Sequence, residues 1–246
     1  MMGGEALFIA AVLVVAGLVK GAVGLGLPPI AMGLMVIVMP PVEAAALLVL
    51  PSFLTNAWQM LRGPYFRRLL RRFWPLLLCA VGGTLVGADW LSEKNARIGT
   101  FILGSVLALY ALSGLVSAQL LIGAAKQRWL GPLSGLTTGL ATAATGVSSI
   151  PIVPYFQAVG LEKDELVQAM GLSFTVSTLA LAVNLASVGA LTPSIGPMVG
   201  LAVAAVFVGI VLGQLLRKRL DAKTFRFWFF VALLLLGLYL AIRAVL

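Results

Sequence analysis

The sequence contains no histidine and a single cysteine, Cys79. One cysteine cannot form an internal disulfide, and without histidine there is no Cys/His cluster that could hold a metal ion. The side chain that most often shuttles protons near neutral pH is missing as well. No hydrolase triad, phosphate-binding loop or metal motif is present. The sequence therefore gives no support for an enzyme, and we expect no catalytic residue, metal or cofactor.

Charged residues are also scarce. They make up 10% of the 246 residues, whereas hydrophobic residues make up 61%, and the mean hydropathy is +1.09. A soluble domain carries about 25% charged residues, because polar side chains must cover its surface. The apolar runs are continuous and of helix length, which excludes the short alternating segments of a β-barrel. The composition predicts an all-α, multi-pass protein of the lipid bilayer.

Ten apolar segments follow one another along the chain, and most reach the roughly 20 residues that cross the hydrocarbon core. Two of them are short, and each follows a break rich in glycine or in threonine, alanine and glycine. We expect eight long and two short helices, with broken helices at Gly24–Pro29 and Gly146–Pro151. The segments cover residues 6–22, 28–40, 44–61, 73–91, 97–118, 131–146, 149–160, 166–190, 196–216 and 225–245. The first has no basic region before it, so we expect a retained span rather than a cleaved signal peptide.

Matching residues recur in the same order in the two halves of the chain. This pattern predicts a first transmembrane repeat over residues 1–118, a cytoplasmic linker over 119–130 and a second repeat over 131–246. Duplicated halves with interruptions at equivalent places are typical of transporters, and the interruptions indicate the substrate site. The matching pairs are Gly17/Gly135, Leu18/Leu136, Gly21/Gly139, Glu43/Asp164, Ser52/Ser173, Phe53/Phe174, Leu91/Leu220, Lys94/Lys223, Arg97/Arg226, Phe101/Phe230, Leu107/Leu236, Leu109/Leu238 and Tyr110/Tyr239.

The net charge of +9 is better explained by cytoplasmic loops than by a nucleic-acid partner, because lysine and arginine gather on the cytoplasmic side of membrane proteins. With ten crossings, the basic stretches 62–72, 126–128 and 217–226 all lie inside, and the halves are inverted repeats of five crossings each. If each short segment continues the preceding helix, there are eight crossings and parallel repeats, and stretch 217–226 falls outside. The rule favours the inverted arrangement, although the acidic stretch 162–165 then also lies inside.

Lys20 lies deep in apolar sequence. A charge inside a membrane segment is costly, and it usually marks a substrate or ion pathway. An ammonium group there would attract an anionic substrate. The alternative is that Lys20 extends to the interface or pairs with an acid at a helix end.

Glycines and prolines around this lysine predict an anion site at a helix N-terminus. Backbone N–H groups near Gly24 and Gly26, and a helix starting at Pro28 or Pro29, could hold an oxyanion. Close helix packing is the alternative, and it is the stronger explanation for Gly17 and Gly21. In the second half hydroxyl groups take the place of the lysine. They belong to Thr142, Thr145, Ser148 and Ser149 around Gly146.

A polar stripe lies at helical spacing in each half. Ser52, Thr55, Asn56 and Gln59 share one helix face, and Ser173, Ser177 and Asn184 form a similar face later in the chain. These side chains either line the substrate path or bond within and between helices. Glu43 and Asp164 begin equivalent segments, where the helix dipole favours an acid.

Two motifs carry a resemblance to a known family. The first, GLVKGAVGLGLPPIAMGLM at residues 17–35, precedes an acid and an Ala/Leu-rich helix with Ser52 and Thr55. The second, ATGVSSIPIVPYFQAVG at residues 144–160, precedes QAMGLSFTVST. Their order and duplication resemble the sulfite exporter TauE/SafE family, also called the 4-toluene sulfonate uptake permease family. Members usually have more contiguous glycines, whereas Leu27 follows Gly26 here.

The resemblance implies an inner-membrane permease that exports small sulfur-containing anions such as sulfite, sulfoacetate or other organosulfonates. We expect the anion between the two broken helices near mid-membrane, and an oligomer is compatible with the sequence. An anion channel and a non-transporting assembly subunit, whose glycines serve only packing, are the alternatives. The expected substrate-binding residues are Lys20, Gly24, Gly26, Pro28, Pro29, Ser52, Thr55, Asn56, Thr145, Gly146, Ser148, Ser149, Ser173 and Ser177.

Overall fold

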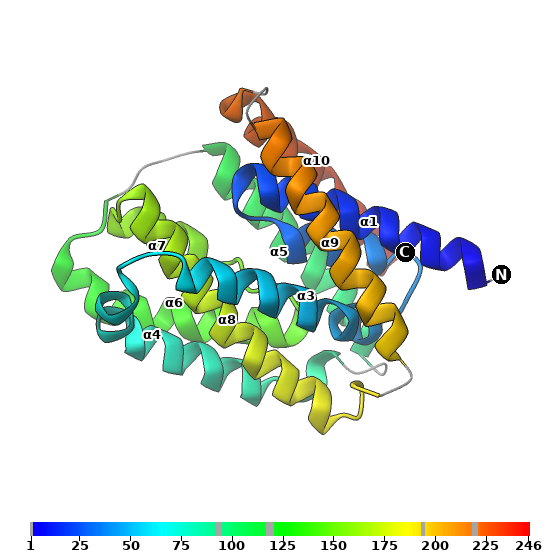
Figure 1. The fold of residues 1–246 in the computed structure, drawn as a ribbon. Coiled ribbons are helices and arrows are strands. Elements are labelled where there is room, and N and C mark those ends of the chain that lie inside the picture. The colour runs from blue at the N-terminus through cyan, green and yellow to red at the C-terminus, as the bar shows by residue number, and fades with distance from the viewer. Residues whose placement is uncertain (1, 92–94, 117–120, 193–194, 218–220) are drawn as a thin grey trace.

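The computed structural model describes residues 2–91, 95–116, 121–192, 195–217 and 221–246. These residues form an all-α bundle without strands (Figure 1). Among the residues named above, Lys94, Lys218, Arg219 and Leu220 lie outside the described part, as do residues 119–120 of the predicted linker. The helices are α1 (Met2–Val23), α2 (Leu27–Met35), α3 (Pro41–Leu61), α4 (Phe66–Val86), the 3₁₀ turn η1 (Ala88–Leu91), α5 (Ala96–Val116), α6 (Ala124–Thr145), α7 (Ile152–Val159), α8 (Lys163–Ser187), α9 (Gly196–Arg217) and α10 (Ala222–Val245).

Seven of the described helices are long and apolar enough to cross a membrane: α1, α3, α4, α5, α8, α9 and α10. Helix α6 has comparable length but begins with Lys126 and Arg128 and is rich in threonine. Helices α2 and α7 have nine and eight residues, so neither crosses a bilayer alone. The side chains on the outside of the bundle are largely apolar, as lipid contact requires. The protein is therefore a multi-pass membrane protein.

Two helices begin well before the apolar segments that predicted them, by more than the other helices do. Helix α4 starts at Phe66 rather than near residue 73, so the expected basic loop is in large part helical. Its first turns are amphipathic, because Leu69 and Phe73 are buried while the arginines between them face outward. Helix α6 likewise starts at Ala124, inside the predicted linker. Apolar content alone missed both starts, because an amphipathic first turn lowers the hydropathy without ending the helix.

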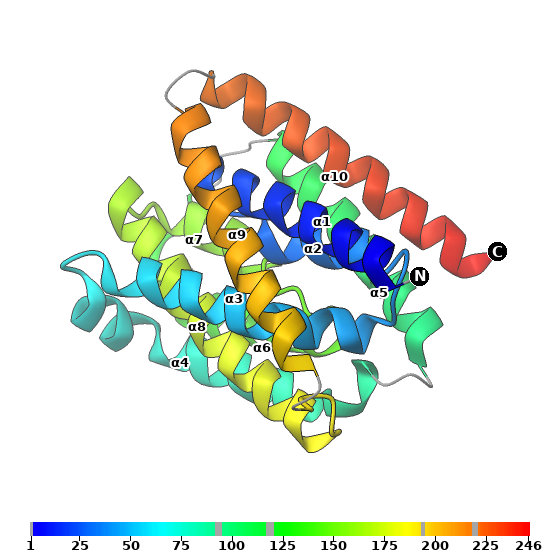
Figure 2. The same ribbon diagram turned by 45° about the vertical axis from the view of Figure 1, so that its right-hand side comes forward.

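Close backbone contacts at glycines hold helix α1 against α9. A Cβ atom added to Gly17 would lie 2.4 Å from the backbone oxygen of Val206, and one added to Gly21 would lie 2.3 Å from that of Ile210. The two helices therefore run in the same direction, side by side (Figures 1 and 2). This confirms the packing alternative for Gly17 and Gly21, since only glycine permits such an approach.

Helices α4 and α6 meet in the same way. A Cβ atom on Gly135 would lie 2.1 Å from the backbone oxygen of Leu76, and one on Gly139 would lie 2.2 Å from that of Ala80. These are the glycines that match Gly17 and Gly21 in the sequence. Each half therefore supplies one helix to each of these two close-packed pairs.

The other large contacts join α3 to α8 and α5 to α10. Gln59 near the end of α3 donates a hydrogen bond to the backbone oxygen of Val167 near the start of α8, so these two helices run in opposite directions. Arg97 at the start of α5 donates to the backbone oxygens of Ala244 and Val245 at the end of α10. Those helices are antiparallel too.

These contacts define two ends of the bundle. At one, which we call the Arg62 end, α1, α3, α5 and α9 finish and α4, α6, α8 and α10 begin. At the other, the Glu5 end, the directions are reversed. Arg68 pairs with Glu165 at 3.5 Å at the Arg62 end, where Arg72 also donates to Gln127. Asn184 donates to the backbone oxygen of Thr84 toward the Glu5 end.

Candidate functional site

The first connection of interest joins α1 to α2 through Gly24, Leu25 and Gly26. Both glycines have positive φ, at 85° and 99°, a region that favours glycine. Gly26 lies immediately before α2, whose first turn contains Pro28. A Cβ atom at Gly26 would press on the Phe229 ring at 3.1 Å, whereas one at Gly24 would meet nothing within 4 Å. Gly24 therefore borders open space, and Gly26 is packed.

The second connection joins α6 to α7. Gly146 has a φ of 70° and ends α6, donating its N–H to the backbone oxygen of Thr142. The hydroxyl of Thr145 accepts a hydrogen bond from the N–H of Val147 at 3.1 Å. The Thr145 side chain thus accepts a hydrogen bond from a backbone N–H that has no carbonyl partner beyond the end of the helix. Helix α7 then begins at Ile152, after Pro151.

Lys20 lies near the end of α1 with 8% of its surface exposed. Its Nζ donates to Thr55 Oγ1 at 3.0 Å and to Asn56 Oδ1, both on α3. Neither partner carries a charge, and the one ion pair among the described residues joins Arg68 to Glu165. The positive charge of Lys20 is therefore hydrogen-bonded but not neutralised by an acid. This excludes the pairing alternative within the described part of the chain.

A cavity of about 560 Å³ opens at the Arg62 end, with Lys20 in its wall. We call it the basic cavity. Arg62 and Arg217 also line it, as do the amides of Gln59 and Gln214 and the hydroxyl-bearing Thr55. None of the described residues that line it is acidic. The cavity lies between the ends of α1, α3 and α9, so three helices bring cations or amides to one space.

A second, much smaller cavity lies between the two connections. It measures about 10 Å³ and is lined by Pro28 of α2, Ser52 of α3, and Gly146 and Ser148 of the α6–α7 connection, together with Thr142 and Thr178. We call it the central cavity. Its volume is what one water molecule needs, so it holds no polyatomic anion in this conformation.

The predicted residues thus divide into three groups. Lys20, Gly24 and Thr55 line the basic cavity, with Asn56 bonded to Lys20. Pro28, Ser52, Gly146 and Ser148 line the central cavity. The others line neither of these cavities. These are Gly26, Pro29, Thr145, Ser149, Ser173 and Ser177.

The polar stripes on α3 and α8 are buried, and part of their hydrogen-bonding capacity is unused. Thr55 donates to the backbone oxygen of Pro51, as the self-bonding alternative expects. The hydroxyls of Ser52, Ser173 and Ser177, however, have no hydrogen-bond partner among the described residues. A buried hydroxyl without a partner is unusual and calls for an explanation.

A third cavity, of about 960 Å³, opens at the Glu5 end. Glu5 of α1 and Glu43 of α3 both line it, and we call it the acidic cavity. Glu43 lies in the first turn of α3 and Asp164 in the first turn of α8, as the helix-dipole interpretation predicts. The two ends of the α1 and α3 helices therefore present charges of opposite sign.

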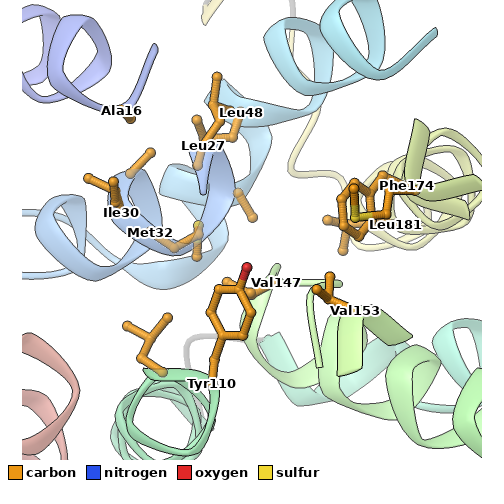
Figure 3. Packing of buried hydrophobic residues seen from close by; sticks show 14 of the residues in the cluster. Ala16, Leu27, Ile30, Met32, Leu48, Tyr110, Val147, Val153, Phe174 and Leu181 are labelled. Carbon is orange, nitrogen blue, oxygen red and sulfur yellow. The ribbon is translucent and has the colours of Figure 1, made fainter. Parts of the chain in front are cut away.

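Sequence reasoning missed the two arginines of the basic cavity and one buried polar group outside the cavities. Arg62 and Arg217 were interpreted as topology signals, and their convergence on one cavity depends on the parallel packing of α1 and α9. Tyr110 was noted only as part of the repeat. Its hydroxyl is fully buried without a partner among the described residues, and Figure 3 shows it directed toward the region of Val147 and Met32. A polar tip in an otherwise apolar run was the signal that could have found it.

This arrangement suits binding rather than covalent chemistry. Amides, hydroxyls and cations can hold an anion, but within the described part of the chain no nucleophile is paired with a base. The described residues contain no group of three metal-ligating side chains.

Comparison with known proteins gives one match. A protein-family model described as "Sulfite exporter TauE/SafE" matches residues 9–240. No curated protein and no solved structure was found to match.

Proposed function

Because the chain belongs to the sulfite exporter TauE/SafE family, and is therefore a membrane transporter and not an enzyme, we propose that it exports small sulfur-containing anions. Sulfite and organosulfonates such as sulfoacetate are the proposed substrates. The plasma membrane is where such a protein would act. One observation carries the proposal: a buried lysine, without an acidic partner among the described residues, faces a cavity that two arginines share.

The energetics of Lys20 favour an anionic ligand. A buried ammonium is costly unless it is paired and hydrogen-bonded. Thr55 and Asn56 accept hydrogen bonds from the ammonium group but do not neutralise its charge. A sulfonate or sulfite oxygen entering the basic cavity would supply the missing charge and accept charge-assisted hydrogen bonds.

We further propose that the two halves are inverted repeats, with the Arg62 end in the cytoplasm. Corresponding helices run in opposite directions, α1 against α6 and α3 against α8. The glycine contacts correspond between the halves as well. A Cβ atom added to Gly213 of α9 would contact the backbone oxygen of Leu18, and one added to Gly83 of α4 would contact that of Leu136. Leu18 and Leu136 are a matched pair in the sequence. The arginines at the Arg62 end support a cytoplasmic location.

Export of an anion from that end needs no coupling ion on energetic grounds. The inside-negative membrane potential contributes about 2.3 kcal/mol per elementary charge per 100 mV in the outward direction. A basic cavity facing the cytoplasm would concentrate the anion where transport starts.

The central cavity supports a carrier rather than an open channel. Its lining comes from α2, which follows the first connection, and from the second connection, as a site between two interrupted helices requires, and its 10 Å³ volume leaves no continuous pore for an anion. An assembly subunit without a transport path is less well supported, because polar residues of both halves meet at this cavity.

Everted membrane vesicles, whose cytoplasmic face points outward, test the proposal. Vesicles with the protein should take up radiolabelled sulfite or sulfoacetate faster than vesicles without it, and uptake should saturate. Thiosulfate and sulfate serve as competitors that rank the substrates. Uptake of both labelled anions equal to that of vesicles without the protein would exclude the proposed function, and uptake that rises without saturation would indicate a channel.

A further inference from the structure

The position that corresponds to Lys20 in the second half is Thr138. Lys20 directly precedes Gly21 and Thr138 directly precedes Gly139, and these two glycines make equivalent backbone contacts on α9 and α4. In the same way Asn56 follows Ser52 by one helical turn, and Ser177 follows Ser173 by one turn. The first half therefore has a lysine bonded to an asparagine where the second half has a threonine and a serine.

Thr138 and Ser177 are both fully buried, and neither hydroxyl has a hydrogen-bond partner among the described residues. This sets Thr138 apart, because the other threonines inside described helices donate to a carbonyl of the preceding turn, except Thr224 in the first turn of α10, which donates to the carboxylate of Asp221. The carbonyl that Thr138 would use belongs to Ser134, and the hydroxyl of Thr137 donates to it at 3.2 Å. A buried hydroxyl without a hydrogen-bond partner lowers the stability of the fold. Its presence is therefore explained best by a role other than stability.

We propose that Thr138 and Ser177 form an uncharged half-site from which the anion leaves toward the Glu5 end, the counterpart of the Lys20–Asn56 site that loads it. The proposal rests on the proposed function. Helices α6 and α8, which carry the two hydroxyls, are in contact. Two hydroxyl donors can hold an oxyanion by charge-assisted hydrogen bonds, but without a cation they hold it more weakly than Lys20 does.

The second half-site is closed in this conformation, as alternating access requires. When inverted repeats rock against each other around a shared site, the cavity on one face closes as its counterpart on the other face opens. The basic cavity is open between α1, α3 and α9. Its counterpart would lie between α6, α8 and α4, where Asn184 of α8 donates to the backbone oxygen of Thr84 of α4 at 2.5 Å. In the proposed cycle α8 and α4 must separate at this hydrogen bond before the anion can pass Thr138 and Ser177.

Opposite charges at the two ends fit this division. The anion is loaded beside Lys20, Arg62 and Arg217, and it leaves at the end of the bundle where Glu5 and Glu43 lie. A weak half-site that empties toward an acidic end of the bundle favours release over rebinding. This difference between the two half-sites changes the rates and apparent affinities of transport. The equilibrium distribution of the anion across the membrane still depends on the membrane potential.

The test is radiolabelled sulfite uptake into everted vesicles by the near-isosteric variants Thr138→Val and Ser177→Ala. We expect each to lower the maximal rate about five-fold or more, while KM at the cytoplasmic face changes less than two-fold. Thr137→Val is the matched control, because its exposed side chain lies one residue away and bonds its own helix. It should keep the parent rate.

Thermal unfolding separates this role from a structural one. Removing an unpartnered buried hydroxyl should leave Tm unchanged or raise it, so a fall in Tm that accompanies the loss of rate would overturn the proposal. A parent rate in both variants would overturn it as well, while saturable uptake by the parent protein would leave the proposed function standing. If the parent protein itself moves none of the tested anions, the proposed function fails first.

Discussion

The α1–α9 and α4–α6 pairs are alike in packing and different in chemistry. In each pair one helix, α1 or α6, carries two glycines one turn apart whose Cα atoms face the neighbouring backbone. Beside the second glycine, however, one pair carries Lys20 and the other carries Thr138. Helix geometry therefore repeats between the halves while the charge does not. If the halves are repeats, as we propose, the difference indicates that their shared helix packing is a scaffold, and that single residues beside the contact glycines decide what each half can bind.

The largest expected effect is on the shared packing. Gly17→Ala and Gly135→Ala place a methyl group 2.4 Å and 2.1 Å from a backbone oxygen, so the helices must separate. Overpacking costs about 1–3 kcal/mol, and we expect both variants to lose yield and thermal stability to a similar extent. The control is Gly82→Ala in α4, where the added Cβ meets nothing within 4 Å. If only one of the variants Gly17→Ala and Gly135→Ala loses stability, the α1–α9 and α4–α6 packing surfaces are not equivalent.

Asn56→Asp sharpens the comparison of charge. The new carboxylate would accept the bond that Asn56 Oδ1 now accepts from Lys20 and would neutralise the ammonium. We expect saturable sulfite uptake in everted vesicles to fall about ten-fold or more in a stably folded protein. Asn56→Ser introduces the residue type that the second half has at Ser177, and it should retain more activity than Asn56→Asp. Equal activity of parent and Asn56→Asp would show that the free charge is not used.

Arg62 and Arg217 should act more weakly, because both side chains are exposed. The double variant Arg62→Gln/Arg217→Gln should raise KM for sulfite at the cytoplasmic face several-fold and reduce the dependence of uptake on ionic strength, since it lowers the local anion concentration. Arg71→Gln, which removes an exposed charge that does not line the cavity, is the matched control. An unchanged KM would mean that the basic cavity does not recruit the substrate.

The smallest expected effect concerns the second connection. Thr145→Val removes the acceptor for the N–H of Val147, and losing such a bond costs about 1 kcal/mol. We expect a modest fall in Tm with uptake largely retained. A rate loss far larger than the stability loss would place Thr145 in the substrate site.

Much of the fold could be predicted from the sequence, and the site only in part. Apolar runs located every described helix to within several residues, and the largest boundary errors fell at the amphipathic starts of α4 and α6. Gly17 and Gly21 were correctly assigned to packing, because small residues at helical spacing have few other uses in a membrane. What could not be predicted is which helices converge. The basic cavity depends on α9 lying parallel to α1, and no local pattern encodes that pairing.

The central claim is that the unneutralised charge of Lys20 binds the transported anion. Its most direct test compares sulfite uptake by Lys20→Ala and Lys20→Arg in everted vesicles, with the exposed Lys126→Ala as the control. We expect Lys20→Ala to lower saturable uptake at least ten-fold, Lys20→Arg to retain part of it, and Lys126→Ala to match the parent. A well-folded Lys20→Ala protein that transports sulfite and sulfoacetate at the parent rate would contradict it.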